Sequence, residues 1–120
     1  METALLPNPT NHNQERTMIK IIDKKRYDTS TATAVASADN GRTPDDFQHQ
    51  EETLYVTKSG SWFLHGQGGP LSQYGEQRGR NRTEGEDLRA LTADEAYAWL
   101  EASQKAEAIG IYFSDQLTDA

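Results

Sequence analysis

The feature that most constrains this chain is a pair of β-prone runs within residues 52–65, joined at Ser59-Gly60. Two runs rich in Thr, Val, aromatic and leucine residues on either side of a short turn with glycine are typical of a β-hairpin. With a two-residue turn, Val56 lies opposite Phe63, and both faces of the hairpin carry large apolar groups. We therefore expect this hairpin at the centre of a sheet that is covered on both sides.

The remaining predicted elements place strands before helices along the chain. The sequence predicts a hairpin over 18–28 that lacks a turn glycine, a strand over 33–37, a short helix over 71–74, a loop over 75–86, an edge strand over 87–91, and helices over 92–102 and 103–117. Strands followed by helices favour an α+β fold over alternating β-α-β units. We expect a small antiparallel sheet, with its central hairpin at about 52–66, packed against the C-terminal helices.

The clearest helix start is Thr92, which is followed three residues later by Glu95. This spacing is typical of a capping box, in which each side chain accepts the backbone N–H of the other residue. Ala96, Trp99 and Leu100 recur at helical spacing and predict a buried stripe. The second helix is predicted to begin after Ser103 and to bury Ala106, Ile109, Gly110, Phe113 and Leu117.

Composition separates a tail from a domain and excludes several classes of protein. Residues 1–17 contain two prolines and little apolar surface, which predicts a disordered tail before a single α+β domain at 18–120. The chain has no cysteine, so disulfides and thiolate metal sites are excluded. No apolar run is long enough to cross a bilayer and no signal-peptide pattern is present, so we expect a cytoplasmic protein without membrane contact.

The chain is acidic, with a net charge of −7. This charge disfavours strong direct binding to nucleic acid, because phosphates are bound mainly by lysine and arginine. The ordinary role of surface acids is to keep a protein soluble, and the alternative is an acidic face that meets a basic protein surface. The candidate contact acids are Asp45, Asp46, Glu51, Glu52, Asp94, Glu95 and Glu101.

His65 is the residue best placed for chemistry, because it lies beside a glycine-rich segment. As a general base it would activate Ser61 or Ser72, with Glu51 or Glu52 as the acid that orients the imidazole. Nothing in the spacing requires this arrangement.

Two other interpretations of His65 compete with the catalytic one. A histidine packed opposite Leu54 in the hairpin would be structural, and this interpretation is favoured. A metal site formed by His49, His65 and the neighbouring glutamates would lack the paired spacing that metal ligands usually show. We therefore predict no catalytic residue, no metal ligand and no cofactor.

Two further segments are candidate binding elements. Residues 66–70 would form an anion-binding nest or end a strand, and they lack the Gly-Lys-Ser/Thr ending of a P-loop. Residues 78–82 contain three arginines, which would contact phosphates or an acidic partner, or remain solvated among nearby acids. Two aromatic residues are candidate partner anchors if they are exposed, and core residues otherwise. These candidate contact residues are Trp62, Tyr74, Arg78, Arg80 and Arg82.

Four segments of the chain carry a resemblance to a known family. They are Ile21-Ile22-Asp23-Lys24-Lys25-Arg26-Tyr27-Asp28-Thr29, Glu51-Glu52-Thr53-Leu54-Tyr55, Trp62-Phe63-Leu64-His65-Gly66 with Gly68-Gly69-Pro70, and Leu91-Thr92 with Glu95-Ala96 and Trp99-Leu100. Together they resemble a family of small proteins carried by phages, plasmids and integrative elements of bacteria. The resemblance covers the chain from Met18 to the C-terminus and supplies no catalytic residues.

The resemblance implies a setting in which small acidic proteins block host defences. The function that it suggests is an anti-CRISPR protein that binds a Cas effector or complex stoichiometrically and excludes nucleic acid. One alternative is an enzyme that acts through the segment His65–Gly69. Another is a small adaptor of a mobile element whose arginines contact nucleic acid. A homodimer that buries an additional apolar face is compatible with the few large aliphatic residues of the chain.

Overall fold

The computed structural model describes residues 17–120, and the predicted tail over 1–17 lies outside these residues except for its last position. Strands precede helices in the described chain, which confirms the α+β class. The elements in chain order are β1 (Ile19–Ile22), β2 (Lys25–Asp28), β3 (Thr33–Asp39), β4 (Gln50–Val56), β5 (Trp62–Gly68), β6 (Glu76–Arg78), β7 (Asn81–Thr83), β8 (Gly85–Leu91), α1 (Ala93–Ala102), α2 (Ala106–Tyr112) and a short 3₁₀ helix, η2 (Ser114–Gln116).

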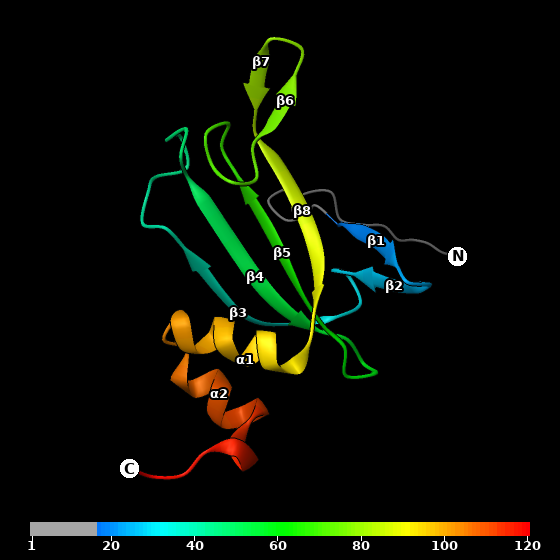
Figure 1. Ribbon diagram of the computed structural model, residues 1–120, viewed down its shortest axis with the longest axis vertical. Helices are drawn as coiled ribbons and strands as arrows, with labels where there is room; N and C mark the ends of the chain where they lie inside the picture. Colours follow the sequence, from blue (N-terminus) through cyan, green and yellow to red (C-terminus); the bar gives the residue numbers. More distant parts are fainter. Residues whose placement is uncertain (1–16) are drawn as a thin grey trace, which may run out of the picture.

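A four-stranded antiparallel sheet in the order β3-β4-β5-β8 forms the centre of the fold (Figure 1). The β1-β2 and β6-β7 pairs form two separate two-stranded sheets. The hairpin of β4 and β5 lies in the middle of the main sheet, as predicted. β5 is the most buried strand, and its buried residues fall on both faces of the sheet.

The register of this hairpin differs by one residue from the prediction. Val56 lies opposite Trp62 rather than Phe63. The N–H of Thr57 donates to the carbonyl of Ser61 at 2.8 Å, and the glycine before Ser61 has a φ of 91°. The loop therefore has three residues, with a turn that ends in a left-handed glycine, and the additional loop residue shifts every cross-strand pair by one.

The helices α1 and α2 cover one face of the sheet. Leu54 of β4 and Leu64 of β5 pack there with Leu100 of α1 in one continuous core cluster. Trp62 stacks on Phe113 with ring centroids 5.2 Å apart, and it is only 8% exposed. Trp62 is thus a core residue, and the alternative in which it is an exposed partner anchor is wrong.

The β1-β2 hairpin covers part of the opposite face. Phe63 is completely buried there, between a stacked Tyr55 at a ring-centroid distance of 4.9 Å and an edge-on Tyr27 at 5.5 Å. Leu88 of β8 completes this second, smaller cluster. The hairpin itself forms as predicted without glycine, because Asp23 and the lysine after it adopt φ values of 53° and 68°.

The segment between β5 and β8 is more ordered than the sequence suggests. The N–H of Ser72 donates to the carbonyl of Gly69, and the N–H of Gly75 donates to that of Ser72. These bonds form consecutive turns in place of the predicted helix over 71–74. The predicted loop over 75–86 contains the β6-β7 hairpin, whose two-residue turn begins at Gly79 with a φ of 62°. β8 is an edge strand, as predicted.

The capping box of α1 is confirmed. The hydroxyl of Thr92 accepts the N–H of Glu95 at 3.1 Å, and the carboxylate of Glu95 accepts the N–H of Thr92 at 2.8 Å. The second helix begins after Lys105 rather than Ser103, because Gln104 has a left-handed φ of 59° and interrupts the helical path. No helix within residues 17–120 is long and apolar enough to cross a membrane.

The buried face of α2 is narrower than predicted. Ile109 and Phe113 are buried with Ala108, whereas Ala106, Gly110 and Leu117 are exposed. The helix ends at Tyr112, so a residue five positions farther along no longer follows its 3.6-residue period.

Asp28, at the end of β2, makes the stability of the fold depend on pH. Its buried carboxylate accepts the hydroxyl of Ser30 at 2.7 Å and the N–H of Ser30 at 2.8 Å. These two hydrogen bonds hold the pKa of Asp28 below its ordinary value. A lowered folded-state pKa contributes stability above the unfolded-state pKa of about 3.9, and this stability is lost as the pH falls through the folded-state pKa.

We expect Asp28→Asn to lower the free energy of unfolding at neutral pH by about 1–3 kcal/mol and to reduce its decline in acid. Ser30→Ala should have a smaller effect in the same direction, because it removes one of the two donors. Urea denaturation at a series of pH values measures both effects. An Asp28→Asn protein with the wild-type acid dependence would contradict this prediction.

Candidate protein-interaction site

A groove of about 640 Å³ opens at the end of the sheet where β3 ends and β8 begins. This is the end from which the β6-β7 hairpin projects, at the top of Figure 1. We call it the acidic groove, because five carboxylates line it against the two guanidinium groups of Arg42 and Arg78. The carboxylates are those of Asp39, Glu51, Glu76, Glu84 and Glu86.

The floor of the acidic groove is a row of polar side chains across three strands. Glu51, Gln67 and Glu86 are cross-strand partners on β4, β5 and β8. The amide of Gln67 donates to the carboxylate of Glu51 at 2.6 Å, and Nε2 of His65 lies 2.9 Å from the carboxylate of Glu86. These bonds fix the floor carboxylates before any partner arrives, which reduces the entropy lost on binding.

The rim of the groove is held by the loop between β3 and β4. The carboxylate of Asp39 accepts the N–H of Gly41 at 2.7 Å, and the side chain of Asn40 donates to the carbonyl of Gln48 at 2.8 Å. Ring Nδ1 of His49 lies 2.9 Å from the carbonyl of Arg42. The loop is thus closed on itself by short-range hydrogen bonds.

Two exposed apolar side chains lie next to the acidic groove. Phe47 is 64% exposed and Leu71 is 56% exposed. The N–H of Leu71 donates to the carbonyl of Phe47 at 2.8 Å, beside Gly69, which lines the groove. An aromatic and an aliphatic side chain beside a charged surface resemble the apolar centre and polar rim of protein interfaces.

The geometry around His65 does not match the predicted catalytic arrangements. His65 lies opposite Thr53, not Leu54, and its carboxylate partner is Glu86. Ser61 is in the turn at the far end of β5. Ser72 packs against Gly68 on the opposite face of the sheet.

Thr53 and Ser37 are the hydroxyl-bearing residues in line with His65 across β4 and β3. Their oxygens lie 2.9 Å apart, and Thr53 is the cross-strand neighbour of His65. In the described chain no hydrogen bond joins this hydroxyl pair to the imidazole. The His65–Glu86 pair has the geometry of a base and the acid that orients it, but neither Thr53 nor Ser37 is hydrogen-bonded to the imidazole as a nucleophile would be.

Glu52 lies outside the acidic groove, on the opposite face of the sheet from Glu51. Its side chain points to the helix-covered face, where it accepts the hydroxyl of Tyr74 at 2.6 Å and the indole N–H of Trp99 at 2.9 Å. The amide of Gln73 also lies 3.3 Å from the carboxylate. Glu52 therefore has a structural role: it joins the turns at residues 69–75, which we call the turn segment, to α1. Its carboxylate is not presented to a partner.

Tyr74 is half-buried against the same face. Burial, followed by the hydrogen bond to Glu52, raises the pKa of Tyr74 well above its ordinary value. The hydroxyl is therefore protonated at neutral pH, where it donates to Glu52. A Cβ atom on Gly66 would overlap the Tyr74 ring, so the ring position depends on glycine there. The other predicted partner anchor is consequently also part of the packed structure.

The glycines at 66–69 allow close packing rather than anion binding. β5 continues through Gly68, and none of these glycines has a positive φ. An added Cβ on Gly68 would meet the Ser72 side chain and the His49 carbonyl, and one on Gly69 would meet the Phe47 carbonyl. The segment therefore ends a strand, as one of the two interpretations predicts, but it does so without a positive φ, and the predicted nest is not observed.

The predicted contact acids do not form one face. Asp94, Glu95 and Glu101 are exposed on α1, which lies at the opposite end of the sheet from the β6-β7 hairpin (Figure 1). Asp45 and Asp46 lie in the loop between β3 and β4. The N–H of Gln48 and the nearby Arg42 hold the pKa of Asp46 below its ordinary value. Of the seven predicted acids, Glu51 lines the acidic groove.

The three arginines of the β6-β7 hairpin have separate environments. Arg78 lies 2.9 Å from the carboxylate of Glu76, and Nε of Arg82 donates to the carbonyl of Pro70 at 2.8 Å. Arg80 is exposed in the turn. Because one arginine is paired with an acid and another holds the hairpin against the turn segment, the run does not form a single basic patch.

The acids of the groove that sequence reasoning missed come from distant segments. Asp39 ends β3, and Glu76, Glu84 and Glu86 belong to the stretch that was predicted as a loop. Alternation along β8 gives no signal for Glu86, because it places Glu86 on the same face as Leu88 and Ala90. Within residues 17–120, no group of three or more histidine or acidic residues is arranged to hold a metal ion.

Comparison with known proteins adds no relative, since no protein family, curated protein or solved structure matches this chain.

The contact between Gly66 and Tyr74 gives a stability prediction. We expect Gly66→Ala to lower the free energy of unfolding by about 1–3 kcal/mol, because the new methyl group would displace the Tyr74 ring from Glu52. Gly110→Ala on α2 is the matched control, since nothing lies within 4 Å of its Cβ position. The control should raise stability by up to about 1 kcal/mol. Equal effects of the two substitutions in urea denaturation would contradict the proposed packing.

Proposed function

We propose that this protein is a stoichiometric inhibitor that binds a basic, nucleic-acid-binding protein through the acidic groove. The observation that carries the proposal is the convergence of five carboxylates from separate segments around one concave surface, with two of them fixed by hydrogen bonds from Gln67 and His65. The five carboxylates outnumber the two guanidinium groups of Arg42 and Arg78. A concave surface with an excess of one sign focuses its field and increases the rate of association with an oppositely charged partner.

The exposed pair Phe47 and Leu71 supplies the apolar part of the proposed interface. Charge complementarity gives rate and specificity, whereas desolvated aromatic and aliphatic anchors contribute most of the binding energy. The pair lies beside the groove, so a partner with an apolar pocket next to a basic channel would engage both features. Nucleic acid that uses the same channel would be excluded.

A CRISPR–Cas effector, within the cytoplasm of a bacterial host, is the target that we propose. This choice rests on the resemblance to proteins of phages, plasmids and integrative elements. Effector complexes hold their guide–target duplex in a positively charged channel, which is the surface that an acidic inhibitor would occupy.

Charge reversal tests the location of the interface. We expect Glu76→Lys with Glu84→Lys in the acidic groove to weaken binding by about tenfold or more, with a smaller effect at high salt. The control is Asp94→Lys with Glu101→Lys on α1, which makes the same change in net charge at exposed sites away from the groove. Tagged proteins are incubated with a nuclease-treated lysate of a bacterium that has active CRISPR–Cas systems, and recovered Cas subunits are quantified by mass spectrometry.

The control should retain the Cas subunits that the wild-type protein recovers. Equal loss with both pairs would contradict binding through the acidic groove. Absence of Cas subunits from the wild-type sample would contradict a Cas target. Recovery that disappears on nuclease treatment would favour the alternative in which Arg80 and its neighbours contact nucleic acid.

An enzyme acting through the segment His65–Gly69 is the second candidate, and the hydrogen bond between His65 and Glu86 is the observation that favours it. An inhibitor acts to a one-to-one endpoint, whereas an enzyme acts below stoichiometry. We expect a titration of effector activity to end at one-to-one and His65→Ala to retain more than half of the inhibition. Turnover by the wild-type protein together with loss of activity in a folded His65→Ala variant would establish the enzyme instead.

A further inference from the structure

We propose that two copies of this chain associate through β3, so that the two central sheets join edge to edge as antiparallel neighbours. The second copy would also cover the apolar groove between β3 and α2. The apolar groove is separate from the acidic groove, although Asp39 at the end of β3 belongs to the paired edge and also lines the acidic groove. The inference does not depend on the proposed inhibitor function.

The two edges of the central sheet differ in their protection. At the β8 edge, the ammonium group of Lys20 binds the carboxylate of Asp87 at 2.8 Å and the carbonyl of Leu88 at 3.1 Å. Within residues 17–120, no strand pairs with the outer edge of β3. β3 has the sequence TAVASAD, without the lysine or proline that natural edge strands use to prevent pairing. Its bulge at Val35 interrupts the edge near its start and leaves the stretch 36–39 regular.

The backbone of β3 offers hydrogen-bonding groups on its free side. The N–H of Asn40 donates to the carbonyl of Gln50 at 3.1 Å, so in an antiparallel ladder Ala38 also bonds toward β4. Ser37 and Asp39 then direct their N–H and carbonyl groups outward. These groups are available to a strand of another molecule.

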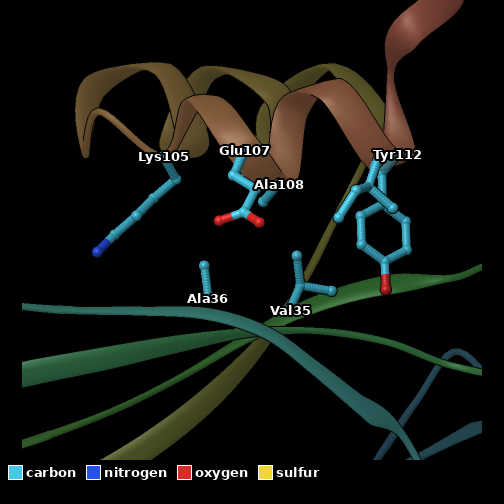
Figure 2. Close-up of a pocket in the computed structure, with 7 residues that line it drawn as sticks. Val35, Ala36, Lys105, Glu107, Ala108 and Tyr112 are labelled. Atoms are coloured by element: carbon cyan, nitrogen blue, oxygen red, sulfur yellow. The ribbon is translucent and has the colours of Figure 1, made fainter.

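An irregularity in β3 shapes the adjoining groove. Val35 is an additional residue between the paired positions Ala34 and Ala36, as in a β-bulge. As a result, Val35 and Ala36 both point toward α2, as Figure 2 shows. Together with α2 they line a groove of about 300 Å³.

The helix side of this groove includes exposed apolar side chains. Ile111 is 67% exposed and Tyr112 is 39% exposed, although both lie beside the apolar floor. The exposed pair continues the surface of Val35, so one patch extends from the strand edge onto the helix. A patch of this kind marks an interaction surface.

A second copy fits this surface better than an unrelated partner, because the surface is complementary to itself. Two identical edges pair as antiparallel strands around a two-fold axis, which is the commonest closed symmetry of oligomers. The small side chains of Ala34, Ser37 and Ala38 leave room for a neighbouring backbone. Lys105 and Glu107 line the same groove with opposite charges, so each copy offers both signs to the other.

Analytical ultracentrifugation of the full chain over a wide concentration range tests the proposal. We expect the wild-type protein to dimerise and Ile111→Lys to weaken the dimer by at least about tenfold, because a charged side chain would replace an apolar one at the interface. Ile21→Lys on β1 is the matched control, since Ile21 is 62% exposed and lies outside the groove. The control should dimerise as the wild type does.

Ser37→Pro tests the strand edge separately, because proline removes an outward N–H and is tolerated at sheet edges. Circular dichroism establishes that each variant is folded. A folded Ser37→Pro variant that is monomeric, together with a monomeric Ile111→Lys, supports pairing through β3. A wild-type protein that remains monomeric at every concentration, or a dimer that withstands both substitutions, overturns the proposal.

Discussion

The arrangement of the helix-covered face depends on the hydrogen bonds that the carboxylate of Glu52 accepts. It receives a hydroxyl hydrogen bond from Tyr74 and an indole hydrogen bond from Trp99, which belong to segments 25 residues apart in the chain. The turn segment and α1 are thereby joined to the same point of β4. A partly buried carboxylate that lost these donors would retain an unfavourable desolvation cost, so the three groups stabilise the fold only together.

Gly66 makes this junction possible because a side chain there would occupy the position of the Tyr74 ring. Gly68 and Gly69 also lack space for a side chain, because Ser72, His49 and Phe47 of the adjoining loops lie close to them. On this face, helices cover β4 and β5 at one end and turns cover them at the other, while the groove between β3 and α2 stays open. On the opposite face the β1-β2 hairpin covers the aromatic end, and the polar row of Glu51, Gln67 and Glu86 is left to line the acidic groove.

This division assigns different roles to adjacent residues of one strand. Glu51 and Glu52 are chemically similar neighbours, yet successive side chains of a strand point to opposite faces. Glu51 lies in the groove and Glu52 in the interior network. The sequence alone supported both as contact acids, because it does not state which face is covered. His65 and Ser72 likewise lie on opposite faces of the sheet, so they do not form the predicted catalytic pair.

The sequence by itself determined the α+β order, the central hairpin, the hairpin without glycine at Asp23-Lys24 and the start of α1 at Thr92. These features depend on local propensity, alternation and capping, which act over a few residues. Tertiary structure decided the hairpin register, the order in residues 75–86 and the membership of the acidic groove. The register depends on the conformation of the loop between β4 and β5, because one additional loop residue shifts every pair in the ladder. The acidic groove depends on distant segments, because its charges gather only where strand ends from different parts of the chain meet.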